Sequence, residues 1–108
     1  MKMSQAVDGF ILEKSLNTSA STMQKYRYVL DRFAGFIGDL DVDSVSSYDV
    51  RRWLLHLATQ HEDGEQRRLS RRTIHDYWAV LSSFWTWAEQ ELSVEHAIRG
   101  RLRLVQAS

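Results

Sequence analysis

The chain has 108 residues, no cysteine, and 14 basic against 14 acidic residues, so its formal net charge is zero. That length suits one domain with a core of modest size, and the lack of cysteine excludes disulfides and thiolate metal sites, which fits a reducing cytoplasm. The first apolar run, residues 10–12, is too short for a secretory signal, and no stretch approaches the roughly 20 apolar residues of a membrane span.

The chain is expected to be helical throughout, because no period-two alternation is long enough for a strand. A first helix is predicted over residues 4–16 and a second over residues 22–37, where residues 21–24 form a capping box. Gly38 readily takes the left-handed conformation that ends a helix. Apolar residues recur at steps of three and four along the second helix: Met23, Tyr26, Leu30, Phe33 and Ile37.

The second half of the chain repeats this arrangement after an acidic connection at residues 39–45. Ser46, with Asp49 three positions later, caps a third helix that fades near Gln60. Ser70 caps a fourth helix over residues 71–91, and Ser93 is expected to cap a short fifth helix that reaches Ile98. We therefore expect one helical domain over residues 1–98, followed at residues 99–108 by a basic tail that looks like the start of a linker.

Charged residues are segregated into blocks although their sum is zero. Four arginines fall within six positions before and at the fourth helix: Arg67, Arg68, Arg71 and Arg72. A helix N-terminus already carries partial positive charge, so two arginines placed there suit an anion such as phosphate. A neutral domain can in this way present one basic face, although arginines in such runs are also common as solvated surface.

No pattern of residues points to catalysis or to a bound metal or cofactor. His56 and His61 are five positions apart, which does not place both on one helical face as an i, i+4 zinc pair would. The chain has no Gly-x-Ser-x-Gly elbow and no glycine-rich phosphate loop. Asp41 and Asp43 lie in a loop with nothing apolar nearby to raise a pKa. We therefore predict no catalytic residue, no metal site and no cofactor.

The four tryptophans divide into two pairs. Trp78 and Trp85 lie on the apolar stripe of the fourth helix and are predicted to be core residues. Trp53 and Trp87 lie off the main stripes. They are candidates to pack against the first helix, a missing second domain or another protomer.

Three blocks of the sequence together resemble the core-binding domain of tyrosine recombinases and phage integrases. They are Ser21-Thr22-x-x-x-Tyr26-x-x-x-Leu30-x-x-Phe33, then Val45-Ser46-x-x-Asp49-Val50-Arg51, then Leu69-Ser70-x-x-Thr73-Ile74 with Leu81-x-x-Phe84-Trp85-x-Trp87-Ala88. The resemblance covers about Val7 to Ile98. It implies an all-α bundle of four to five helices, built from two crossed helical hairpins and often described as SAM-like. It also implies that strand cleavage belongs to a separate C-terminal domain, whose catalytic arginines, histidines and tyrosine have no counterpart here.

The same resemblance implies a DNA-binding module. In the family, the starts of the second and fourth helices approach the duplex, which implies Ser21, Thr22, Lys25, Ser70, Arg71, Arg72, Thr73 and His75 here. Arg67 and Arg68, in the loop before the fourth helix, are expected to add salt-sensitive attraction to DNA. The implied partners are double-stranded DNA, the catalytic domain of the same parent protein and neighbouring recombinase protomers, with no membrane. Because the first and last helices contact protomers in the family, Phe10 and Ile98 are expected to be partly exposed.

Two departures from the family pattern and two alternatives accompany this interpretation. Asp76 stands where family members commonly place a basic residue, and the absence of proline removes the Asn-Pro step that usually precedes the linker. One alternative is a helical protein-interaction module that docks through an aromatic surface and has no nucleic-acid partner. The other, a free-standing helix-turn-helix repressor, lacks a short helix pair joined by a tight glycine turn.

Overall fold

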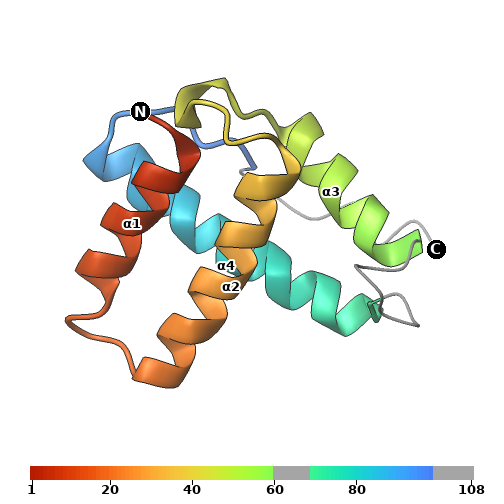
Figure 1. Ribbon diagram of the computed structural model, residues 1–108, viewed down its shortest axis with the longest axis horizontal. Helices are drawn as coiled ribbons and strands as arrows, with labels where there is room; N and C mark the ends of the chain where they lie inside the picture. Colours follow the sequence, from red (N-terminus) through yellow and green to blue (C-terminus); the bar gives the residue numbers. More distant parts are fainter. Residues whose placement is uncertain (60–68, 99–108) are drawn as a thin grey trace.

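Four α-helices build the part of the chain that the computed structural model describes, residues 1–59 and 69–98. They are α1 (Met3–Lys14), α2 (Ala20–Phe36), α3 (Ser47–Thr59) and α4 (Arg71–Glu91), and a short 3-10 helix, η1 (Val42–Ser44), lies between α2 and α3 (Figure 1). These two stretches contain no strand, only an isolated bridge between Lys2 and Asp41.

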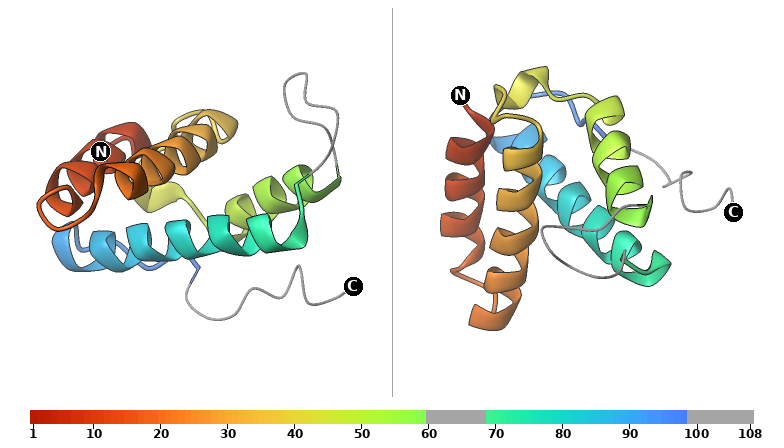
Figure 2. Two further views of the ribbon diagram at one scale, coloured as in Figure 1. Left: turned by 90° about the horizontal axis from the view of Figure 1, so that it is seen from below. Right: turned by 45° about the vertical axis from the view of Figure 1, so that its right-hand side comes forward.

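The helices pair as two hairpins that cross. α1 and α2 run antiparallel side by side, and the α3–α4 hairpin crosses them so that α4 passes behind α2 (Figure 1). α4 contacts each of the other three helices, and the left-hand view of Figure 2 shows it running along the molecule beneath them. The predicted all-α fold of two crossed hairpins is confirmed, with four α-helices among the described residues.

Aromatic side chains fill the core where the hairpins cross. Phe33 of α2 lies 5.3 Å from Trp53 of α3 and 6.0 Å from Trp85 of α4, measured between ring centroids. Phe10 of α1 makes a second cluster with α4, at 5.5 Å from Phe84. Edge-to-face and tilted pairs at these spacings add to the free energy gained by burying the rings. The core therefore joins all four helices.

The two tryptophans off the main stripes also belong to this core. Trp53 is 2% exposed and stacks on Tyr77 of α4, so none of the three partners proposed for it is the one found. Trp87 packs against α1, which was the first of the three predicted partners, and its ring lies 5.6 Å from that of Phe10. Gly9 permits this approach, because a Cβ there would lie 3.3 Å from Trp87 Cη2. The predicted burial of Trp78 and Trp85 is confirmed.

The expected exposure of Phe10 and Ile98 is wrong. Phe10 is 0% exposed and Ile98 is 2% exposed. Phe10 is enclosed by the rings of Tyr26, Phe84 and Trp87, and Ile98 closes the core at the end of the described chain.

Serine caps set three of the helix starts, one of them two residues earlier than predicted. Ser46 and Asp49 form the predicted capping box, in which the Ser46 backbone N–H donates to Asp49 Oδ2 at 2.9 Å. Ser70 caps α4 as predicted. For α2, however, it is Ser19 whose Oγ accepts from the Thr22 N–H, so Ser21 lies in the first turn and the capping box predicted at residues 21–24 is wrong. Ser19 holds the extended backbone that a cap requires (ψ 155°).

The fifth helix predicted from Ser93 is absent from the described residues. Ser93 has φ 57°, a left-handed conformation, and directly follows the C-cap residue Leu92. It therefore ends α4 instead of beginning another helix. Residues 93–98 then form an irregular segment and a turn, held by a 3.3 Å contact between Thr86 Oγ1 and His96 Nε2. Most of the loop before α4, residues 60–68, and the basic tail at residues 99–108 lie outside the described residues.

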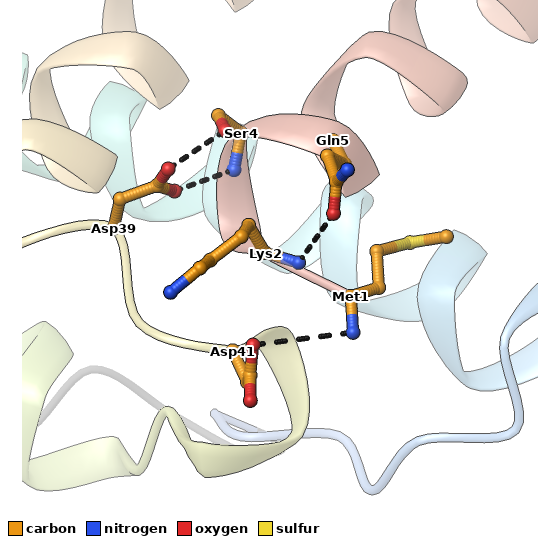
Figure 3. A network of polar contacts seen from close by, with 6 residues as sticks. All are labelled: Met1, Lys2, Ser4, Gln5, Asp39 and Asp41. Carbon is orange, nitrogen blue, oxygen red and sulfur yellow. Dashed lines mark hydrogen bonds and ion pairs between the residues drawn. The ribbon is translucent and has the colours of Figure 1, made fainter.

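A polar network fastens the start of α1 to the connection between α2 and α3 (Figure 3). The backbone N–H and the hydroxyl of Ser4 both donate to the Asp39 carboxylate at 2.8 Å. The Met3 N–H donates to the Leu40 carbonyl at 2.8 Å, and the Met1 amino group lies 4.0 Å from Asp41 Oδ1. Asp39 thus satisfies a first-turn donor of α1 from across the fold, directly after Gly38 has ended α2 with φ 72°.

Asp39→Asn is expected to lower the melting temperature at pH 7 and to weaken its pH dependence. Hydrogen bonds from the Ser4 backbone and hydroxyl hold the pKa of Asp39 below its ordinary value. A depressed carboxyl pKa stabilises the fold fully above the unfolded-state pKa, about 3.9, and this contribution is lost as pH falls through the lower folded pKa. Thermal melts at pH 7 and pH 3 measure it, with Asp43→Asn, an exposed carboxyl in η1, as the control. An equal fall in melting temperature between these pH values for wild type and Asp39→Asn would contradict it.

Candidate nucleic-acid interface

The start of α4 presents a basic helix N-terminus to solvent. The Ser70 hydroxyl accepts from the Thr73 N–H at 3.2 Å and donates to Thr73 Oγ1 at 3.0 Å, which fixes the first turn. Arg71, Arg72 and His75 are exposed, and the first turn contains no acidic residue. The arginines therefore add to the positive end of the helix dipole.

The start of α2 is a second helix N-terminus open to solvent. Ser19 caps it, and its hydroxyl also donates to Thr22 Oγ1 at 3.0 Å. Ser21 and Lys25 are exposed one turn apart, and Thr22 is half-buried. This turn also lacks an acidic residue. Both predicted contact regions therefore combine backbone donors with basic or hydroxyl side chains.

The two starts lie on the same side of the molecule but not next to each other. α2 begins at the lower left and α4 at the lower right of Figure 1, and the view from below places them at opposite ends of that side (Figure 2). The structure therefore does not gather the predicted residues into one pocket. It places them at two separate helix starts, and the two helices run in different directions from there.

Arg27, a basic residue in the middle of α2, differs from those near the two helix starts because it forms two ion pairs. Arg27 lies 3.1 Å from Asp8 Oδ1 and 3.6 Å from Asp31 Oδ2, so its charge is compensated between α1 and α2. Asp76 is exposed on α4 and reduces the positive charge beyond the first turn. Among the lysines and arginines of α2 and α4, those classed as exposed are Lys25, Arg71 and Arg72, near the two helix starts.

The described residues contain neither a grouping of metal ligands nor a helix that could cross a membrane. Over residues 1–59 and 69–98, no three histidine or acidic side chains are grouped so as to hold a metal ion. Within the same ranges, no helix has the length and apolar character needed to cross a membrane.

Comparison with known families decides the relationship that the three sequence blocks indicated. Residues 7–92 match the family described as phage integrase, N-terminal SAM-like domain. The chain belongs to this family. No curated protein and no solved structure matches it. The matched range runs from the second turn of α1 to Leu92, so this integrase domain comprises all four helices, and the predicted resemblance is confirmed.

The integrase domain also has two candidate contact residues that the sequence did not single out. Tyr28 and Arg32 follow Lys25 along the exposed side of α2, at the spacing that keeps residues on one helical face. The Arg32 guanidinium lies 5.1 Å from the Tyr28 ring centroid, and Tyr28 is 53% exposed. They extend the contact region of the α2 start by two turns.

These two side chains also meet α4. Burial raises the pKa of Tyr77 above its ordinary value, the neighbouring Tyr28 hydroxyl raises it further, and Arg32 opposes the rise. Tyr77 is one turn beyond Thr73, so α2 and the beginning of α4 are electrostatically coupled at this point. Arg67 and Arg68, the remaining predicted site residues, lie outside the described residues.

Proposed function

We propose that this integrase domain binds duplex DNA through the starts of α2 and α4 and contributes no strand cleavage of its own. The observation that carries the proposal is the exposed pair Arg71 and Arg72 on a capped helix N-terminus without acidic residues. Such an end offers backbone donors, a favourable dipole and two guanidinium groups to a phosphate.

The two contacts have the character of backbone recognition. Phosphate contacts fix where a protein sits on a duplex, whereas sequence is read at base edges in the grooves. The exposed His75 is the side chain of the α4 start best placed to reach a base edge. We therefore expect modest sequence specificity from this domain and attribute the affinity mainly to phosphates.

We further propose that a separate C-terminal catalytic domain of the parent protein supplies the chemistry, with residues 1–98 as the binding unit and residues 99–108 leading to it. Contact with other protomers is supported by the end of α1. Leu12, in the last turn of α1, is 74% exposed, and Leu16, two residues beyond the end of that helix, is 80% exposed. Exposed apolar side chains of this kind suit a protein contact.

The alternative of a protein-docking module without a nucleic-acid partner depended on an aromatic surface. The tryptophans that suggested such a surface are all buried, at 9% exposure or less. The arginines of the α4 start remain exposed in their place. The structure thus favours DNA over this alternative.

Fluorescence anisotropy of a labelled random-sequence duplex, titrated at 50 and 200 mM salt, tests the proposal. Three phosphate contacts, from Lys25, Arg71 and Arg72, predict that affinity falls by about 40-fold between the two salt concentrations. A serum protein serves as the control. Binding no stronger than that of the control, or binding independent of salt, would overturn the proposal.

A further inference from the structure

A hollow of about 300 Å³ lies between the end of α2 and the exposed side of α3. Its lining residues are Phe36, Arg52, Leu55, His56 and Thr59. We call it the α2–α3 hollow. None of these residues belongs to the two helix starts.

Arg52 is held over this hollow by aromatic rings. Its guanidinium lies 4.8 Å from the Phe36 ring centroid and 5.9 Å from that of Tyr48, and its side chain is 45% exposed. A guanidinium stacked on a ring keeps its in-plane N–H donors directed outward and loses little further freedom when it binds an oxyanion.

Asp49 compensates the Arg52 charge only in part. Asp49 Oδ1 lies 3.7 Å from Arg52 Nη2, while its Oδ2 accepts from Ser46 in the capping box of α3. A guanidinium has five N–H donors in a planar fork, so one long contact leaves donors for a second anion.

The rest of the hollow suits a sugar–phosphate backbone. The His56 ring packs 5.4 Å from that of Phe36 and forms part of the same wall. Leu55, 48% exposed, supplies an apolar patch against which a sugar can rest. The Thr59 hydroxyl also lines the hollow, but it donates its proton to the Leu55 carbonyl at 2.8 Å and so has none to offer a phosphate.

The hollow continues the contact line of α2. Ser21, Lys25, Tyr28, Arg32 and Phe36 follow one another along one side of that helix. At 1.5 Å per residue, the line is about 22 Å long. It begins at the helix start and ends at the Phe36 ring that supports Arg52. A strand that contacts Lys25 and then Arg32 along this line would next reach Arg52.

We propose that Arg52 makes an additional contact to the phosphate backbone of duplex DNA at the α2–α3 hollow, so that α3 joins α2 and α4 in holding the duplex. This inference rests on the proposed function. The continuity of the hollow with the α2 start, along a line about 22 Å long that also carries Lys25, favours the regularly spaced phosphates of a duplex over an acidic peptide.

Titration of Arg52→Ala with a labelled random-sequence duplex at 50 and 200 mM salt tests it. Loss of one phosphate contact is expected to reduce the salt-induced fall in affinity by about 3.5-fold and to weaken binding at 50 mM salt. Arg27→Ala is the matched control, because it removes the same charge from an arginine paired with Asp8 and Asp31. Arg52→Lys should recover only part of the loss, since an ammonium lacks the planar fork. Circular dichroism melts establish that each variant is folded.

The outcomes separate this inference from the proposed function. If wild type binds DNA and Arg52→Ala has the same affinity and salt dependence as Arg27→Ala, the contact at the hollow is excluded. The proposed contacts at the two helix starts are then unaffected. If wild type binds no duplex, both fail. If wild type binds poly-glutamate as tightly as DNA and Arg52→Ala weakens both equally, the hollow is a site for acidic protein segments and the DNA contact is overturned.

Discussion

Replacing Phe33 with alanine is expected to lower the free energy of unfolding by about 3 to 5 kcal/mol, the range for truncating a fully buried phenylalanine. Phe33 is 0% exposed and its ring meets Trp53 of α3 and Trp85 of α4, so the truncation leaves a cavity where the two hairpins cross. Urea unfolding followed by circular dichroism at 222 nm measures it. Domains of this size are stable by only about 5 to 15 kcal/mol, so the change removes a large share of the stability.

Phe36→Ala is the matched control in the same helix. Phe36 is half-buried and packs under His56 and Arg52 at the edge of α3 instead of in the core. Its truncation is expected to cost less than about half as much, because less area returns to water and no enclosed cavity forms. If Phe33→Ala does not fold, Phe33→Leu, at about 1 kcal/mol, replaces it. Equal losses at positions 33 and 36 would contradict a core centred on Phe33.

Periodicity alone predicted the helices but not all of their ends. The apolar steps along α2 and α4 identified the buried faces because they depend only on helical geometry. Ser19 and Ser21 are both competent N-caps, and the conformation of the chain entering α2 decided between them. Ser93 is a good cap by residue type, yet the end of α4 placed it in the left-handed region. Caps are chosen by local backbone geometry, which residue type does not fix.

The tryptophans show a second limit of the sequence. A single apolar stripe predicts contact with one neighbour, whereas α4 contacts three helices and so buries a much wider arc. Trp78 and Trp87 therefore both lie in the core although they contact different helices. The Arg51 guanidinium of α3 lies over the Trp78 ring, and the Phe10 ring of α1 packs against Trp87. Which helix a buried side chain contacts depends on tertiary packing, and a local sequence pattern does not specify that packing.

In the candidate site, too, some features could be predicted from the sequence and others depend on how the helices pack. The family resemblance predicted the starts of α2 and α4 as the DNA-contact regions. The structure places both starts on one side of the molecule, at opposite ends of it. Their separation, the coupling of Tyr28 and Arg32 to Tyr77, and the α2–α3 hollow depend on how α2 packs against α3 and α4. The spacing of Arg32 from Lys25 was a usable signal, since seven residues return to the same helical face.

Replacing Arg71 and Arg72 together with alanine is expected to produce the largest loss of DNA binding. Removal of two phosphate contacts should reduce the salt-induced fall in affinity between 50 and 200 mM by about 12-fold and weaken binding at 50 mM by at least about tenfold. Anisotropy titration of the random-sequence duplex measures both. Helicity at 222 nm should be unchanged. The melting temperature should not fall, because positive charges in the first turn oppose the helix dipole.

The double variant Lys2→Ala/Arg27→Ala is the control for this experiment. It removes the same net charge, but Lys2 lies at the start of α1 and Arg27 is paired with Asp8 and Asp31. A long-range effect of net charge would weaken binding equally in both double variants, whereas a local contact would weaken it only when the α4 start is changed. Unchanged binding in Arg71→Ala/Arg72→Ala would remove the α4 start from the interface and leave α2 as the remaining candidate.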